Sequence, residues 1–268
     1  MMPSKGKEKE TSQLTAELNC RIQTNEKFGN AKLTPWLIDR LHLQKGERLL
    51  DIGCGTGKHL IPFAKRISTD FACTGMDLSG RSLKDAEETA KKEDLKIRLI
   101  EKSMDDMDGL IKPSCYDDQY DIITVIYAAY YSKNISAFLE NIKTMLRPGG
   151  RIAIMGPYSD NNKEWFDFLS QFMKLPDNVM ESTTTFMPQK ILPFAAENFD
   201  EARCFRFVNT IIIPSIEDLR RYWISNIYYG EKYNAQFEKF AKLHFEKNKI
   251  FSFKKVALLA IMEKVSKE

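Results

Sequence analysis

The chain of 268 residues is long enough to bury the core of one large domain. Its 43% hydrophobic and 29% charged residues are typical of a globular protein in water. The 40 basic and 37 acidic residues leave a net charge of +3, which disfavours nucleic-acid binding and a polybasic membrane anchor.

Cysteine usage and hydropathy indicate a cytoplasmic location. The five cysteines are odd in number and form no C-x-x-C pair, so we expect reduced thiols and no structural zinc (Cys20, Cys54, Cys73, Cys115 and Cys204). The opening "MMPSKGKEKE" lacks the apolar region of a secretory signal and is expected to be a tail. The nearly apolar stretch at 122–131 is too short to span a bilayer.

Helix-like and strand-like patterns alternate from residue 31 onward. Helices are expected at 33–43, 57–67, 79–93 and 134–147, and strands at 47–53, 71–78, 95–103, 120–127 and 151–156. We expect Thr34 to cap the first helix, Ser79 to begin the third, and the Pro148-Gly149-Gly150 turn to end the last. Strands separated by helices predict an α/β fold with a doubly wound parallel sheet.

The regular alternation of strand-like and helix-like patterns ends after Gly156. Helix and loop are expected over 157–200, a strand at 201–213, a helix from Ser215 and a last strand at 252–264. We therefore predict a tail with a lid helix over 1–30 and a single domain over 31–268. Its expected parts are a cofactor-binding core at 31–156, a cap with the sixth strand at 157–250, and the last strand at 251–268. A lid is expected over residues 21–36, with the rings of Phe28 and Trp36.

A turn with three glycines follows the first strand, in "RLLDIGCGTGKHL". The P-loop pattern does not fit, because Lys58 is followed by His59 and the glycine spacing differs. Lys58 also occupies the position where the dinucleotide pattern needs its third glycine, which counts against NAD. A carboxylate at the strand end, Asp51, would repel a pyrophosphate and suits a ligand that carries an ammonium group.

The pattern Asp51-x-Gly53-x-Gly55-x-Gly57 resembles motif I of the class I S-adenosylmethionine-dependent methyltransferases. The resemblance continues through Asp77, "EKSMDDM", "YDIITVIYAAYYS" and "LRPGGRIAI", with spacing similar to the ubiquinone/menaquinone-type branch. It implies a mostly parallel seven-stranded sheet with a helical cap and S-adenosyl-L-methionine as cofactor. The residues implied in cofactor binding are Asp51, Gly53, Cys54, Gly55, Gly57, Asp77, Leu78, Ser103, Met104 and Ile126.

Each implied contact has a physical rationale. Amides of the glycine turn suit the methionine carboxylate, Asp51 suits the amino group, and Asp77 suits two vicinal ribose hydroxyls. One departure lies after the third strand, where the family often has Asp followed by a small residue and this chain has Ser103 and Met104, with Asp105 next.

Methyl transfer from a sulfonium needs positioning and, for some acceptors, proton removal, but no dedicated nucleophile. The catalytic residue is therefore open, and the candidates are Tyr127, Tyr130, Tyr131, Tyr158 and His59. The catechol-type enzymes place a metal-binding Asp where this chain has Ile126. Asp160 and Asn161 resemble only half of such a site, so we expect no metal.

Aromatic residues crowd the segment 157–250, and a cap of that composition favours a small, partly apolar organic acceptor. Most of these rings must nevertheless be the core of the added helices. The accepting atom (O, N or C) and the oligomeric state stay open. The alternatives are an RNA or protein acceptor, a binding protein that no longer transfers methyl, and an NAD-dependent oxidoreductase.

Overall fold

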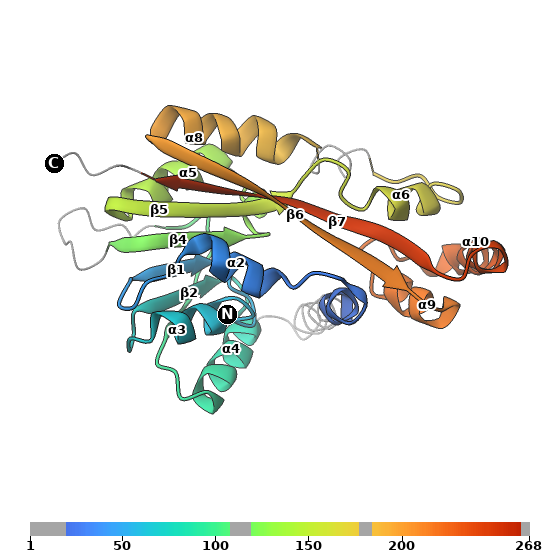
Figure 1. Cartoon of the computed structure of the whole chain (residues 1–268), viewed down its shortest axis with the longest axis horizontal. Helices are drawn as coiled ribbons and strands as arrows, with labels where there is room; N and C mark the ends of the chain where they lie inside the picture. Colours follow the sequence, from blue (N-terminus) through green and yellow to red (C-terminus); the bar gives the residue numbers. More distant parts are fainter. Residues whose placement is uncertain (1–19, 108–118, 177–183, 264–268) are drawn as a thin grey trace, which may run out of the picture. The chain divides into compact units, whose positions relative to one another are not determined.

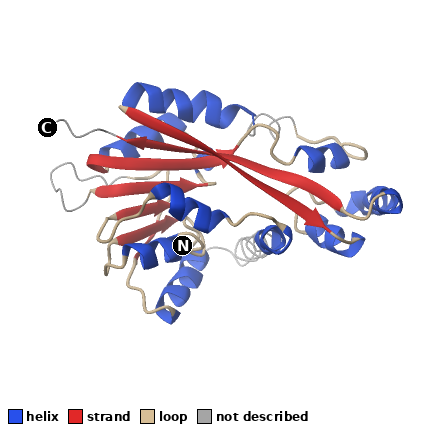
Figure 2. Cartoon of the chain, in the orientation of Figure 1, coloured by secondary structure: helices blue, strands red, loops and turns tan. Residues whose placement is uncertain are grey.

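The computed structural model describes residues 20–107, 119–176 and 184–263 (Figure 1). The predicted opening tail and Cys115 lie outside these ranges. Strands and helices alternate along the chain (Figure 2), and the strands form one sheet in the order β3-β2-β1-β4-β5-β7-β6. This confirms the predicted α/β fold with a seven-stranded sheet.

The first five strands give the sheet its parallel part. The strands are β1 (Leu49–Ile52), β2 (Cys73–Asp77), β3 (Arg98–Glu101), β4 (Tyr120–Ile126), β5 (Leu146–Pro157), β6 (Glu201–Ile213) and β7 (Phe251–Glu263). Strand β1 pairs in parallel with both β2 and β4, so the winding of the sheet reverses at β1. Strand β7 is antiparallel to β5. Ligands of such sheets bind beyond the carboxyl ends of the strands where the order reverses, which is the end of β1 and β4 here.

Helices fill the connections between the strands, and some of them begin at side-chain caps. They are α2 (Leu33–Leu41), α3 (Leu60–Ile67), α4 (Gly80–Lys92), α5 (Ile135–Thr144), α6 (Lys163–Leu169), α8 (Leu192–Asn198), α9 (Ile216–Ile224) and α10 (Asn234–Lys247); residues 20–28 are also helical. The hydroxyls of Ser79 and Ser215 accept hydrogen bonds from the amides of Ser82 and Asp218, which confirms both as helix starts. None of the helices in the described ranges is both long and apolar enough to cross a membrane.

Two local predictions are wrong. Helix α2 already begins at Leu33, so Thr34 lies inside its first turn and does not cap it. Helix α5 ends at Thr144, and the Pro-Gly-Gly stretch belongs to β5. The reason is pairing: Leu146 pairs with Tyr120, and the register then jumps to Arg151 and Ile122, which leaves the intervening residues as a bulge.

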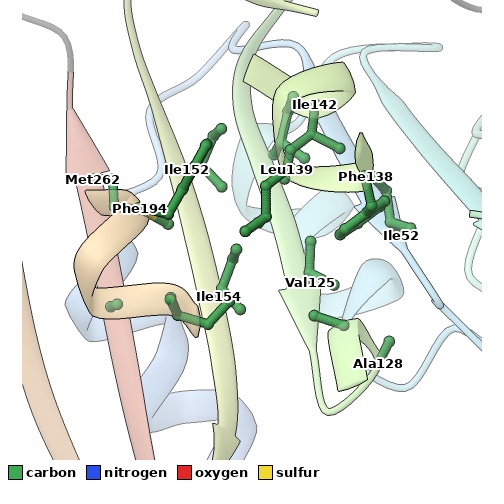
Figure 3. Close-up of a cluster of buried hydrophobic side chains, with 14 of the residues drawn as sticks. Ile52, Val125, Ala128, Phe138, Leu139, Ile142, Ile152, Ile154, Phe194 and Met262 are labelled. Atoms are coloured by element: carbon green, nitrogen blue, oxygen red, sulfur yellow. The ribbon is translucent and has the colours of Figure 1, made fainter. Parts of the chain in front are cut away.

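The chain divides into two compact units. We call residues 33–159, 181–207 and 257–268 the sheet unit, and residues 1–32, 160–180 and 208–256 the aromatic unit. The core of the sheet unit is mainly aliphatic (Figure 3), with Ile52, Val125, Leu139 and Ile154 among its labelled members. Strand alternation places Ile52 and Val125 on the face of the sheet that packs with α5.

The aromatic unit is built from rings contributed by three distant stretches of the chain. Trp165 on α6 lies 5.1 Å from Tyr222 on α9 and 6.0 Å from Phe251 on β7, measured between ring centroids. Phe28 packs against this core, whereas Trp36 contacts Phe207 in the sheet unit. The two rings expected in one lid therefore belong to different units, and the predicted segment 157–250 is divided between them as well.

Candidate functional site

Asp51 is a buried carboxylic acid near the end of β1. Its side chain lies on the face opposite to Leu50 and Ile52, and the residue is only 2% exposed. The hydroxyl of Thr124, its register partner on β4, donates a hydrogen bond to Asp51 Oδ1 at 2.7 Å. Burial is the largest cause that raises the pKa of Asp51 to about 7; the Thr124 hydrogen bond opposes this rise, and the nearby Asp77 carboxylate adds to it. An arriving cation would stabilise the charged form of this group.

The glycines of the turn after β1 all have positive φ, at 74° for Gly53, 54° for Gly55 and 77° for Gly57. A Cβ on Gly53 would lie 2.4 Å from the Cβ of Ala128, so close approach of the backbones also requires glycine there. A Cβ on Gly55 would meet nothing within 4 Å. The turn therefore packs tightly at its start and is open at its middle glycine, as a backbone cradle for a ligand must be.

Asp77 at the end of β2 holds this turn in place. Its Oδ2 accepts a hydrogen bond from the amide of Gly55 at 2.8 Å, and its Oδ1 accepts one from the amide of Ser79 at 2.8 Å. Each carboxylate oxygen can accept further hydrogen bonds, so the group can also take two hydroxyls. The next residue, Leu78, is 72% exposed and leaves an apolar side chain beside the carboxylate.

The loop after β3 is held by hydrogen bonds of Asp105 that the sequence did not predict. The Asp105 carboxylate accepts hydrogen bonds from the hydroxyl of Ser132 at 2.6 Å and from the amide of Lys133 at 3.0 Å. These bonds hold the pKa of Asp105 below its ordinary value and tie the loop to the residues that follow β4. Ser103 accepts from the Asp105 amide, and Met104 packs against the sheet-unit core. No sequence signal links Asp105 to partners so far along the chain.

The tyrosine candidates occupy different environments. Tyr127 follows β4 with a φ of 55°, and its amide bonds to the carbonyl of Met155 at 2.9 Å. The Tyr130 ring lies 4.6 Å from that of Tyr131, which is 72% exposed, and Tyr158 is partly buried against the sheet-unit core. Burial raises the pKa of both Tyr127 and Tyr130 above the ordinary phenol value. Both phenols are therefore neutral hydrogen-bonding groups at physiological pH.

His59 and Cys54 both make packing contacts in the sheet unit. The Nδ1 atom of His59 lies 2.9 Å from Thr34 Oγ1, and its ring stacks on Phe63. Burial, with the nearby Lys58 charge, lowers the pKa of His59 to about 3, so the ring is neutral. Cys54 is 7% exposed, and burial raises the pKa of its thiol, which keeps it protonated.

The two residues that resemble half a metal site lie in the aromatic unit. Asn161 Oδ1 accepts a hydrogen bond from the amide of Val256 at 3.0 Å, so its side chain is committed to β7. Ile126, at the β4 end where a metal-binding acid would stand, is 7% exposed. Within the described ranges, no three His, Cys, Asp or Glu side chains gather as metal ligands would.

The structure thus brings Asp51, the glycine turn and Asp77 together through direct hydrogen bonds and neighbouring charges. Ser103 and Met104 lie on the loop that follows the neighbouring strand, β3, whose Glu101 pairs with Asp77. These features define a doubly wound α/β protein whose strand ends carry a backbone cradle between two carboxylates.

Comparison with known proteins identifies the family. A model of the methyltransferase domain matches residues 43–209, which is more than half of the chain. The chain therefore belongs to the methyltransferase domain family, and its fold is that of the class I methyltransferases. The match covers β1 to β5 and most of β6.

Individual relatives are similar to this chain over about half of its length. The chain is 32% identical over 123 residues to a 27-O-demethylrifamycin SV methyltransferase of Amycolatopsis mediterranei, covering 46% of this chain and 43% of that protein. It is 25% identical over 135 residues to a demethylmenaquinone methyltransferase of Listeria welshimeri, covering 50% and 55%. The chain thus spans about half the length of these curated relatives. The solved BH2331 protein of Bacillus halodurans C-125 is similar in fold, with a TM-score of 0.59 at 18% identity, covering 88% of this chain and 100% of that one.

Proposed function

We propose that this protein is an S-adenosylmethionine-dependent methyltransferase. The observation that carries the proposal is the combination of Asp51, the open Gly55 turn and Asp77 at neighbouring strand ends. A zwitterionic amino acid joined to a nucleoside needs an anionic contact for its ammonium group, hydrogen-bond donors for its carboxylate and an acceptor for two hydroxyls. The carboxyl ends of β1 and β2, with the glycine turn, supply all three kinds of contact.

Each group of the cofactor has a counterpart of suitable chemistry at this site. Within the part of the chain that the structure describes, the buried Asp51 carboxylate has a hydroxyl partner and no ion pair, and the cofactor's ammonium group would satisfy it. The turn amides would hold the methionine carboxylate, and Asp77 would accept the ribose hydroxyls. The other residues assigned to the cofactor are Cys54 and Gly57 in the turn, Leu78 and Met104 beside the adenine, and Ser103 and Ile126 at the adjoining strand ends.

When bound, this cofactor supplies an electrophilic methyl group on a sulfonium. The protein has to orient the acceptor and keep water away. The neutral phenols of Tyr127 and Tyr130 suit hydrogen-bond donation and sulfonium contact better than proton removal. The exposed Tyr131, with Tyr158 and His59, completes the set of residues proposed to act on the acceptor.

We propose a small organic molecule as the acceptor. The support is the chemistry of the relatives, since the two named above act on a rifamycin and on a menaquinone precursor according to their names. The modest net charge of +3 also favours this class over RNA. We further propose that residues 157–250 govern acceptor choice, so Tyr158→Ala should change turnover more than cofactor affinity.

Isothermal titration tests the cofactor directly. We expect S-adenosylmethionine and S-adenosylhomocysteine to bind at about micromolar affinity or tighter, near −8 kcal/mol. NAD titrated into the same folded sample should give no saturable heat. Binding of NAD without S-adenosylhomocysteine would establish the oxidoreductase alternative instead. Tight cofactor binding with no transfer to a panel of small acceptors and to RNA would favour a binding protein.

A further inference from the structure

Thr124 on β4 is the polar neighbour of Asp51 in the sheet. The two residues are register partners on adjacent parallel strands, so their side chains lie on the same face. The next strands contribute Gly75 on β2 and Ala153 on β5 to this row, and neither offers a polar side chain. Along this row of the sheet, the Thr124 hydroxyl is therefore the side-chain group that can bond the Asp51 carboxylate.

The Thr124 hydroxyl donates to Asp51 rather than to the backbone. Its oxygen lies 2.7 Å from Asp51 Oδ1 and 3.5 Å from the carbonyl oxygen of Leu50. A hydroxyl carries one proton, and only the shorter distance is typical of an O–H···O bond, so the carboxylate receives it. Thr124 is 0% exposed and Asp51 is 2% exposed, which limits competition from water for this bond.

Other titratable groups also act on Asp51. They are the Asp77 carboxylate at the end of β2, the Cys54 thiol in the glycine turn and the Cys73 thiol on β2. Burial is the main cause that raises the pKa of both thiols, so they stay protonated and uncharged at physiological pH. Asp77 and burial both disfavour ionisation of Asp51, whereas the hydrogen bond from Thr124 favours it, because a donor stabilises the charged form of an acid.

From this arrangement we infer that Thr124 is a positioning residue of the proposed cofactor site. Its hydroxyl occupies one oxygen of the Asp51 carboxylate and leaves the other, Oδ2, for an ammonium group. Burial alone would present a neutral acid to that group, and the bond from Thr124 favours the charged form that the ammonium group needs. The inference rests on the proposed function, since it concerns the contact of Asp51 with the amino group of the cofactor.

The pH dependence of S-adenosylhomocysteine affinity tests this role. Isothermal titrations of the full wild-type chain should give an affinity that rises with pH, with a midpoint near the pKa of Asp51, about 7. Thr124→Val removes the donor and is similar in shape, so the midpoint should move up by about one pH unit. The affinity near pH 7 should then fall about fivefold, and the affinity near pH 9 should stay within about twofold of the wild type.

Further variants separate this role from a merely structural one. Thr124→Ser keeps the hydroxyl and should keep the wild-type midpoint. Thr74→Val is the matched control: Thr74 on β2 is 3% exposed, and its register partner Leu50 places it on the opposite face of the sheet from Asp51. This control should leave the midpoint unchanged. If Thr124→Val does not fold, Thr124→Ala also lacks the hydroxyl and should show the same shift of the midpoint.

Carbon-13 NMR of the aspartate carboxyl groups checks the contact without a ligand. In the free protein, the titration of Asp51, assigned with Asp51→Asn, should move to higher pH in Thr124→Val. An unmoved midpoint in Thr124→Val, or an equal shift in Thr74→Val, would overturn the inference and leave the proposed function standing. No binding of S-adenosylhomocysteine by the wild type at any pH would instead overturn the proposed function, and the role of Thr124 toward the cofactor with it.

Discussion

The site in the sheet unit and the core of the aromatic unit are assembled in opposite ways. Asp51, the glycine turn and Asp77 lie within 27 residues, and backbone amides connect them. The aromatic core instead joins residues of α6, α9, α10 and β7, held by ring contacts between distant segments. The first site also gathers negative charge, and the second holds the Lys255 ammonium group beside Tyr222 and Phe253.

This difference shows which parts of a chain carry readable signals. A local turn whose function requires backbone contact must use glycine and a fixed spacing, so it appears as a motif. A packed core requires only apolar volume, which many residue combinations provide. Substitutions in the two regions should therefore have different effects. Those in the first region should reduce ligand affinity, and those in the second should reduce stability.

The largest effect is expected for Trp223→Ala in the aromatic unit. Trp223 is 1% exposed, stacks on Phe237 with centroids 5.4 Å apart, and donates from its indole to Asn234 at 2.9 Å. Its removal should lower the free energy of unfolding by about 3–5 kcal/mol. Denaturant unfolding followed by circular dichroism measures this.

The control for that variant is Trp36→Ala, which removes a half-buried tryptophan from the sheet unit. It should cost less stability than Trp223→Ala because less apolar surface is buried. The comparison between the two units would break down if Trp36→Ala proved the more damaging change. It would also break down if folded Trp223→Ala lost cofactor affinity.

Asp77→Ala should have the next largest effect, this time on binding. Charge-assisted hydrogen bonds contribute about 1.5–3 kcal/mol each, so S-adenosylhomocysteine affinity should fall at least about tenfold. Stability should fall too, since the amides of Gly55 and Ser79 lose their acceptor. Asp70→Ala is the matched control: Asp70 pairs with Lys96 on the surface, and its removal should change neither quantity measurably. Unchanged affinity in Asp77→Ala would show that the ribose is held elsewhere.

A smaller effect is expected in the pH dependence of stability. The folded protein raises the pKa of Asp51 from an ordinary value of 3.8 to about 7, so between these values it binds a proton that the unfolded chain does not. The free energy of unfolding should therefore decrease as the pH rises from about 4 to about 7 and then level off. Asp51→Asn should remove this contribution, which is measured as the difference between wild-type and variant unfolding curves across that range.

Cofactor affinity should depend on pH in the opposite direction to stability over this range. An ammonium group beside Asp51 favours the ionised carboxylate, so S-adenosylhomocysteine affinity should rise with pH up to about 7. Titrations at several pH values check this, with Asp51→Asn expected to show a flatter profile. An affinity that falls over this range in the wild type would place the ammonium group away from Asp51.

The smallest effect is expected for metal removal. The amide oxygen of Asn161 already accepts a hydrogen bond from the Val256 amide, and the apolar side chain of Ile126 cannot coordinate a cation. EDTA should therefore change neither the melting temperature nor, once an acceptor is found, the turnover. Loss of turnover on chelation and its recovery with magnesium would contradict this expectation.

Much of the architecture could be predicted from the sequence because local rules decide it. The strand at 201–213 matches β6 to the residue, and the serine caps of α4 and α9 follow from hydroxyls that compete for free helix amides. The positions of Asp51, the three glycines and Asp77 at or after strand ends also followed from the strand pattern and the resemblance to the family. Their roles toward a cofactor remain predictions that the titrations above address.

Tertiary structure decided what depends on residues far apart in the chain. It moved the end of α5 back to Thr144, because pairing between Leu146 and Tyr120 outweighs the helical preference of the last turn. It committed Asp105 to Ser132 and Lys133, and it placed Lys255 over the Tyr222 ring. None of these juxtapositions has a fixed spacing, since each depends on how separate segments pack, and packing leaves no periodic trace in the sequence.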